Sequence, residues 1–321
     1  MKRTAACAGC ALFLALLCWH SAACADAVRA ALNLCLTSAV PALFPFFAAS
    51  SLAVSCGMAQ TCGRLLSPVM RRCFHLPGCG AAALVLGFLG GYPAGARMAA
   101  ELWRAGLCTK SEAEALAACC NNTGPAFLIG MCGGGLFHSL RAGLFLYAVH
   151  IASALLTAVL LRPKQLPPAG SCPAPPEQPF SRLFTQSVCS AGRSCLMISA
   201  FILFFSVVLC LLRLTGVLAA TCAVPAAALL PLGLTTDGVH STLTGCVELT
   251  QGLAGLTAQA GTLPARLTAI SFLCALGGLS VLFQTAACTE GLSFHRCVRA
   301  KCLHACLAAG LCALLTGLLR G

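Results

Sequence analysis

Long apolar runs with almost no charged residues constrain this chain more than any other feature of its sequence. The run from Cys195 to Leu212 carries no charge and is about as long as a spanning helix, which needs roughly 20 apolar residues. Charged residues make up only 9% of the chain and hydrophobic residues 59%, whereas about a quarter of a soluble domain is charged. Because so few polar side chains cannot cover the surface, the sequence predicts an all-α, polytopic integral membrane protein in contact with the lipid bilayer.

The chain has room for about eight spanning segments and a few shorter re-entrant ones. Its formal net charge is +12, but the basic residues stand singly or in pairs between apolar runs, as they do at the cytoplasmic ends of spanning helices. No stretch combines basic and aromatic residues into a platform for bases, so we expect no nucleic-acid partner. Whether the protein forms oligomers stays open.

The residues that catalysis or metal binding would need are scattered. Many of the 25 cysteines lie inside apolar runs, where cysteine packs as a small hydrophobe. The histidines form no HExxH motif or close pair, and His304 is interpreted as an interfacial or packing residue. Neither a Walker A lysine motif nor GxSxG occurs. The sequence therefore predicts no metal site, no cofactor and no enzymatic activity.

Proline and glycine interrupt the apolar runs of the first half. Pro41 and Pro45 fall within one run, where each removes a backbone donor and predicts a broken helix. The short run from Gly80 to Ala96 has a centre that a straight spanning helix would rarely accept, and it predicts the tip of a re-entrant hairpin. The residues assigned to this tip are Gly90, Gly91, Tyr92, Pro93 and Gly95.

A charged segment and then a polar break follow this run. Thr109 or Ser111 is expected to cap the helix that Glu112 begins. That helix runs into the sequence Asn121-Asn122-Thr123-Gly124-Pro125 before an apolar run resumes. A substrate site and a satisfied kink, in which the amides cap the next half-helix, both fit this break.

The second half has corresponding interruptions. The polar stretch Glu248-Leu249-Thr250-Gln251-Gly252 interrupts one segment. The run from Leu267 to Leu282 has Gly277 and Gly278 at its centre and resembles the first hairpin in length and glycine placement, so it predicts either a second hairpin tip or a break in a helix. Ser280 and Gln284 follow four residues apart, so they share one helix face, where either an aqueous pathway or a helix contact would explain them.

A proline-rich linker divides the chain nearly in half. Residues 162–180 contain seven of the sixteen prolines, which predicts an extended, semi-rigid connector. We therefore expect a first membrane half at residues 1–161 and a second at residues 181–321. Because each half contains an interrupted polar segment and a short glycine-centred run, the sequence predicts a transporter built from two repeats.

Glu248 is the most informative acid of the chain, because it is flanked by Val247 and Leu249 in an apolar setting. An ionisable group at membrane depth costs a few kcal/mol and indicates function. The alternative is a solvated connector at residues 236–262. In the functional interpretation, the two polar breaks approach each other near mid-membrane. The substrate-binding candidates are Asn121, Asn122, Thr123, Gly124, Pro125, Glu248, Thr250, Gly252, Ser280 and Gln284.

Six stretches of this sequence have a familiar pattern. They are Pro41–Phe47, Gly90–Ala96, Leu107–Thr109 with Glu112–Glu114, Asn121–Pro125 with Phe127 and Gly130, Glu248–Gly252, and Gly277–Val281 with Gln284. In this order they resemble the YlbJ-type sporulation integral membrane proteins, which belong to the nucleoside-recognition (Gate) domain superfamily.

The resemblance implies a Gate-type fold related to concentrative nucleoside transporters, in the cell membrane or forespore membrane of a spore-forming bacterium. It also implies a role in sporulation, since the YlbJ type is associated with moving dipicolinate into the developing spore. The leading hypothesis is a transporter or channel for a small anionic metabolite, with dipicolinate as the candidate. The alternatives are a non-transporting scaffold for spore-envelope assembly and a nucleoside-type transporter.

The linker gives the first testable prediction. Replacing Pro167 and Pro168 by Ser should leave transport unchanged, because an extended connector without apolar periodicity makes no packed contacts. Uptake normalised to the amount of protein in the membrane would check this. Loss of uptake at a normal protein level would show that the linker needs a defined conformation.

Overall fold

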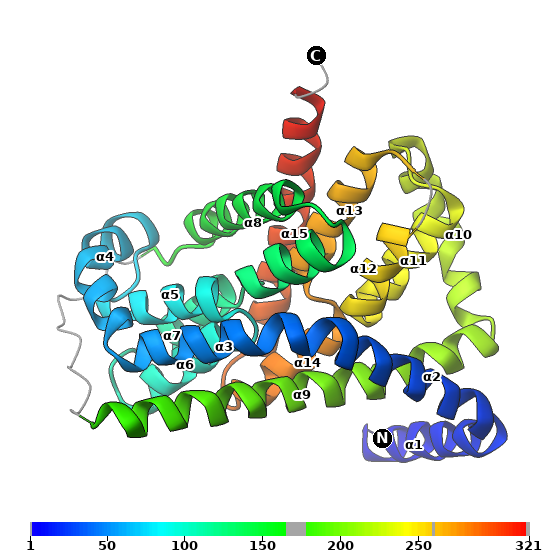
Figure 1. The fold of residues 1–321 in the computed structure, drawn as a ribbon, viewed down its shortest axis with the longest axis horizontal. Helices are drawn as coiled ribbons and strands as arrows, with labels where there is room; N and C mark the ends of the chain where they lie inside the picture. The colour runs from blue at the N-terminus through cyan, green and yellow to red at the C-terminus, as the bar shows by residue number, and fades with distance from the viewer. Residues whose placement is uncertain (1, 165–177, 259–260, 319–321) are drawn as a thin grey trace.

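A computed structural model describes residues 2–164, 178–258 and 261–318, and every element in these ranges is helical. The elements of the first half are α1 (Lys2–Trp19), α2 (Ser21–Leu34), η1 (Cys35–Ala39), α3 (Val40–Ser55), α4 (Met58–Phe74), η2 (Gly78–Gly80), α5 (Ala81–Gly90), α6 (Ala94–Arg104), α7 (Lys110–Cys120), η3 (Ala126–Leu136) and α8 (Leu140–Leu160). Those of the second half are α9 (Phe180–Leu214), α10 (Val217–Leu229), η4 (Leu230–Leu232), α11 (Thr236–Val247), α12 (Leu249–Ala258), α13 (Leu263–Leu276), α14 (Gly278–Cys288) and α15 (Phe294–Leu318). The long helix α9 of the second half runs beside α2 and α3 of the first half (Figure 1). Most of the proline-rich linker, with Pro167 and Pro168, lies outside the described residues.

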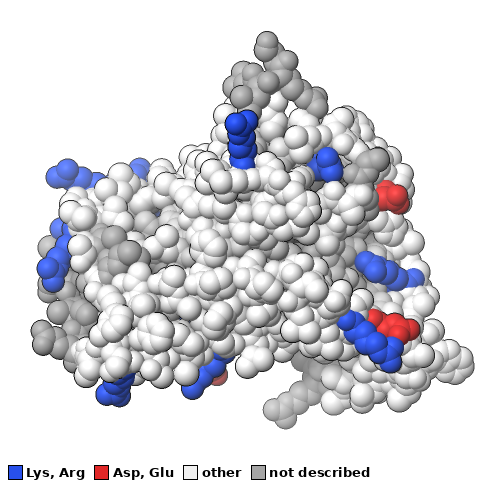
Figure 2. All heavy atoms as spheres, in the orientation of Figure 1, with Lys and Arg blue, Asp and Glu red and all other residues white. Residues whose placement is uncertain are grey.

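Five helical segments of the described chain are long and apolar enough to cross a membrane, which confirms the predicted membrane protein. They are Ser21–Ser55, Leu140–Leu160, Phe180–Leu214, Leu263–Cys288 and Phe294–Thr316. A sixth is reached if Arg64–Phe74 and Gly78–Gly90, which bend by 109°, count as one span. The number is lower than the eight or so expected from length, because several apolar helices end after 10–17 residues. On the face shown in Figure 2, charged side chains lie around the outline and the centre is uncharged, as suits contact with lipid.

The prolines of the first apolar run do not break their helix as expected. The candidate span Ser21–Ser55 stays helical through both Pro41 and Pro45. The turn before Pro41 is a π-helix, η1, which includes Thr37 four residues upstream. A proline ring clashes with the carbonyl four residues before it, and the wider π turn gives that ring room.

Each half instead contains one hairpin of short helices closed by a pair of glycines. A Cβ added to Gly95 on α6 would lie 2.7 Å from the Cα of Gly87 on α5. A Cβ added to Gly252 on α12 would lie 2.2 Å from the Cα of Gly245 on α11. Only glycine permits such a close approach of two backbones.

The second hairpin therefore lies at residues 236–258, and the run Leu267–Leu282 contains the other form expected there, a break in a helix. The later run belongs to one candidate span, Leu263–Cys288, which is interrupted at Gly277. Gly277 has a left-handed backbone with φ of 87°, which ends α13 without reversing the chain direction. Both halves thus have the same order of elements: a hairpin (α5–α6 or α11–α12), a broken helix (α7–η3 or α13–α14) and a span (α8 or α15).

Helix α7 is fixed at both of its ends. Thr109, one of the two expected caps, accepts a hydrogen bond from the Glu112 N–H at 3.3 Å, and the Glu112 carboxylate accepts one from Thr109 N at 2.8 Å. At the other end, the carbonyl of Cys120 packs on the first hairpin, where a Cβ added to Gly87 or Gly95 would lie 1.9 Å from its oxygen. The first hairpin therefore holds α7 at the point where the polar break begins.

This contact gives a prediction on stability. Gly95→Ala should lower the free energy of unfolding by about 1–3 kcal/mol, because the new methyl group overlaps backbone that must shift. Thermal unfolding in detergent, followed by circular dichroism, would measure the change. Gly192→Ala on α9 is the matched control, since a Cβ there meets no atom within 4 Å. Equal melting temperatures for the two variants would contradict the close packing.

Candidate functional site

Three helix breaks meet in the middle of the molecule. Tyr92, between α5 and α6, donates its hydroxyl to the carbonyl of Cys274 on α13 at 2.8 Å. Thr123, between α7 and η3, donates to the same carbonyl at 2.7 Å. Gly91 lies against Gly124, since a Cβ added to Gly91 would be 2.9 Å from the Gly124 nitrogen. The tip of the first hairpin and the breaks of both broken helices are therefore joined directly.

A small cavity of about 40 Å³ lies at this meeting point, and both halves of the chain line it. Six of the substrate-binding candidates line it: Thr123, Gly124, Glu248, Thr250, Ser280 and Gln284. Gly91 and Tyr92 of the first hairpin tip complete the polar part, and Phe47 and Phe127 add aromatic rings. The volume suffices for a few water molecules. A ring-bearing metabolite would fit only after the walls move apart.

The structure brings the two predicted polar segments together at this cavity, but the two asparagines point elsewhere. The Asn121 amide donates to Thr285 Oγ1 at 2.8 Å, and the Asn122 amide donates to the carbonyl of Cys119 at 2.8 Å. Neither side chain lines the cavity. The Asn122 amide satisfies a carbonyl that the end of α7 leaves free, and the Asn121 amide ties the break to α14.

Glu248 lies at the tip of the second hairpin and is only 1% exposed, which excludes the solvated connector. One carboxylate oxygen accepts from the Thr250 N–H at 3.1 Å and the other from the Gln251 N–H at 2.8 Å. The carboxylate thus caps the N-terminus of α12, where the helix dipole stabilises negative charge. The same side chain also lines the cavity, so the cap leaves it within reach of a ligand.

The remaining predicted residues divide between lining and shaping the site. Ser280 and Gln284, both buried on α14, share the helix face that forms one cavity wall. Gly252 instead packs against Gly245 within the second hairpin, and Pro125 precedes the first turn of η3. Gly278 follows the break of α13, where an added Cβ would lie 2.6 Å from the Gly245 carbonyl oxygen.

The sequence interpretation missed a buried polar network behind the cavity. Lys301 on α15 is 1% exposed and donates to the carbonyl of Asn121 at 2.8 Å. His304 lies 3.3 Å from the Lys301 nitrogen and 3.1 Å from Ser153 Oγ of α8, so it is buried and hydrogen-bonded and is not interfacial. His150, also on α8, accepts a hydrogen bond from the Thr123 N–H at 3.0 Å. The sequence signal for it was the three-residue spacing of Lys301 with His304 and of His150 with Ser153, each pair within an apolar run.

A larger groove of about 560 Å³ adjoins the cavity and shares Phe47 and Tyr92 with it. The groove lies between α3, the first hairpin and α9. Serines and charged groups line it, including Ser50, Ser194 and the ion pair of Arg97 with Glu101 at 3.0 Å. Phe47 and Tyr92 thus form part of the wall of both the groove and the cavity.

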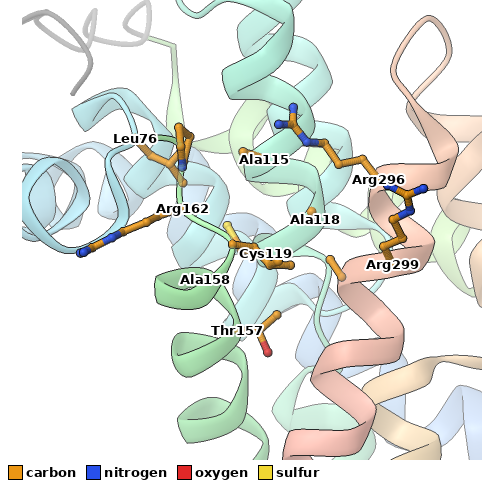
Figure 3. Close-up of a pocket in the computed structure, with 12 residues that line it drawn as sticks. Leu76, Ala115, Ala118, Cys119, Thr157, Ala158, Arg162, Arg296 and Arg299 are labelled. Carbon is orange, nitrogen blue, oxygen red and sulfur yellow. The ribbon is translucent and has the colours of Figure 1, made fainter. Parts of the chain in front are cut away.

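Another pocket, of about 240 Å³, lies between α7, α8 and α15. Figure 3 shows that two of its three arginines reach away to neighbouring helices. Arg162 donates to the carbonyl of Cys73 on α4 at 3.2 Å, and Arg296 pairs with Glu114 on α7 at 3.2 Å. These guanidinium groups therefore hold helices together, and the central cavity remains the candidate site.

The hairpins, broken helices and central cavity define an all-helical integral membrane protein with discontinuous helices. Residues 36–134 match the Gate family, described as nucleoside recognition. The fold is similar to that of CNTnw in an inward-facing substrate-bound state, with a TM-score of 0.54 and 15% identity, covering 87% of this chain and 74% of that one. The chain is also 29% identical over 291 residues to the sporulation integral membrane protein YlbJ of Bacillus subtilis (strain 168), covering 83% of this chain and 71% of YlbJ. The expected resemblance to the YlbJ-type proteins and the Gate superfamily is confirmed.

The cap at Glu248 gives a prediction. Glu248→Gln should lower the free energy of unfolding by about 1–3 kcal/mol, because the amide nitrogen cannot accept from a backbone N–H and leaves one donor unpaired. Thermal unfolding of the purified protein would show a lower melting temperature. Glu290→Gln, at an exposed position, should leave it unchanged. An unaltered melting temperature for Glu248→Gln would mean that the carboxylate does not hold the hairpin tip.

Proposed function

We propose that this chain transports a small, ring-bearing anionic metabolite across a membrane, with dipicolinate as the candidate substrate. The observation that supports this most is the convergence of helix breaks from both halves on one cavity. Transporter sites form where discontinuous helices of two repeats meet. In this proposal residues 1–161 and 181–321 are the two repeats, and each supplies a hairpin, a broken helix and a span.

The groups around the cavity suit a ring that carries carboxylates. Thr250 and Ser280 bring hydroxyl groups, and Gln284 brings an amide. The Thr123 hydroxyl already donates to the Cys274 carbonyl and offers its oxygen as an acceptor. Phe47 and Phe127 offer apolar surface to the ring. Asn121, Asn122, Pro125 and Gly252, which do not line the cavity, keep the two breaks in shape.

The groove beside the cavity favours transport over a scaffold role. It places a polar entrance against the cavity, with Phe47 and Tyr92 common to both. A scaffold would need no path that ends at a buried polar site. Movement of these two side chains would connect the groove with the cavity and let a ligand pass.

Glu248 has a separate role in this proposal. An ionised carboxylate would repel an anionic substrate at low dielectric. During transport Glu248 is therefore protonated, or neutralised by a coupling cation. Substrate movement then depends on an ion gradient through this residue.

A nucleoside-like substrate is the second candidate, and Glu248 is the observation that favours it. A carboxylate beside the hydroxyl groups of Thr123 and Thr250 suits the hydroxyl donors of a sugar. The two candidates differ in how removal of the Glu248 charge should change ligand binding. Loss of the Glu248 charge would weaken binding of a neutral sugar-bearing ligand but would not weaken binding of an anion.

The test is uptake of labelled dipicolinate and labelled uridine into liposomes that contain the purified protein, with imposed proton or sodium gradients. We expect dipicolinate uptake above that of protein-free liposomes, together with its dependence on one of the gradients. Glu248→Gln should keep dipicolinate binding and lose the gradient dependence, whereas Glu290→Gln should retain both. Uptake by Glu248→Gln with an unchanged rate and unchanged gradient dependence would contradict the role of Glu248. Uptake of uridine alone would replace the first candidate with the second.

A further inference from the structure

Lys301 is a buried cation whose partners are all uncharged groups. Its nitrogen donates to the carbonyl of Asn121 at 2.8 Å, lies 3.3 Å from His304 Nδ1, and stands 4.8 Å from the centre of the Tyr92 ring. Within the described part of the chain, no aspartate or glutamate forms an ion pair with it. The side chain is among the largest that the fold buries completely.

The hydrogen bonds around Lys301 have directions that fit a donating lysine amino group and two neutral histidines. His304 accepts from Lys301 through Nδ1, which leaves its Nε2–H to donate to Ser153 Oγ at 3.1 Å. His150 accepts from the Thr123 N–H through Nε2, so its proton is on Nδ1. The other titratable groups that face Lys301 are Tyr92, Cys274 and Cys297, and none of them is a carboxylic acid.

A buried cation without a counter-ion is costly, by several kcal/mol in a low-dielectric interior. Folds keep such groups inside a membrane where they serve a substrate or an ion. Asn121 also has a buried carboxamide oxygen with no hydrogen-bond partner among the described residues. Among the described residues, the network around Lys301 therefore lacks a counter-ion for the lysine and a donor for the Asn121 carboxamide oxygen.

Two of the groups that Lys301 contacts belong to segments that form the central cavity. Tyr92 lines the cavity itself, and Asn121 is two residues before Thr123, which lines it as well. Glu248, the buried acid, lines the cavity from the second hairpin. The site thus has a buried positive charge behind the wall of Tyr92 and Thr123, and a buried negative charge in its lining at a different segment.

We propose that Lys301 is a charge-selecting residue of the cavity: it holds the wall of Tyr92 and Thr123 at positive potential, so that a bound carboxylate is oriented toward this wall. Lys301 acts through that wall and is a positioning residue. The inference rests on the proposed anion transport and adds a specific requirement to it. The ligand that fits has a carboxylate at this wall, and a second carboxylate facing Glu248 is accepted only while Glu248 is protonated or neutralised.

The test compares equilibrium binding of a pyridine dicarboxylate and of its uncharged diamide, which has nearly the same shape, to the purified protein. The wild-type protein should bind the dicarboxylate more tightly. Lys301→Met should reduce that preference by about tenfold or more, through weaker dicarboxylate binding. The reason is that the lysine charge attracts a bound carboxylate through an interior of low dielectric. Binding of the diamide should stay unchanged, which a merely structural defect would not allow.

Lys110→Met is the matched control, because Lys110 also lies over an aromatic ring, Trp103 at 5.8 Å, but is exposed. It should keep the wild-type preference. Lys301→Gln is the second variant: it removes the charge while it can still donate to the Asn121 carbonyl, and it replaces Lys301→Met if that protein does not fold.

A wild-type preference that survives in Lys301→Met or Lys301→Gln would overturn the inference and leave the proposed transport standing. Equal wild-type affinity for the acid and the diamide would overturn it without any variant. Absence of binding and uptake of any anion by the wild-type protein would remove the proposed function, and the inference with it.

Discussion

The polar backbone groups that a broken helix exposes must find partners where water is scarce, and most of the central structure follows from this requirement. The carbonyl of Cys274 receives the hydroxyls of Tyr92 and Thr123. The carbonyl of Asn121 receives the ammonium group of Lys301. The first amides of α12 donate to Glu248. An unpaired group in hydrocarbon costs several kcal/mol, so each break is tied to side chains of another helix, and the breaks gather at one place.

Glycine contacts bring these breaks within reach of each other. The pair Gly87 and Gly95 and the pair Gly245 and Gly252 let each hairpin close without a gap between its helices. The first pair also leaves room for the carbonyl of Cys120, and Gly278 packs on the carbonyl of Gly245. In both halves, a glycine contact therefore seats the hairpin against the broken helix that follows it. Because both halves have the same order of elements, the cavity walls come from corresponding elements of each half.

Two buried charges of opposite sign complete the site without forming a pair. Glu248 is stabilised by backbone amides at a helix N-terminus, and Lys301 by a carbonyl, an imidazole and an aromatic ring. Neither arrangement uses the other charge, so both are open to respond to a ligand or an ion that enters between the helices. Such separated charges are expensive to keep for stability alone. They are consistent with a site whose occupant supplies the missing charge.

The sequence by itself determined the membrane setting, the all-helical class and the approximate places of the breaks, because apolar length, proline and glycine act locally. It also narrowed the helix cap to Thr109 or Ser111, of which the structure shows Thr109. It indicated Glu248 as well, since a single acid in an apolar segment can be recognised from the sequence alone. It did not show that Pro41 and Pro45 remain helical, because a neighbouring π turn relieves their clash. It left open whether Gly277 and Gly278 mark a hairpin tip or a break in a helix, because glycine frequency does not distinguish the two, and it did not show the hairpin at residues 236–258. The contact of Asn121 with Thr285, and the network of Lys301 with His304 and His150, depend on helices far apart in the chain. Only the tertiary structure decided them, because a buried polar group takes its partners from whichever helix packs beside it.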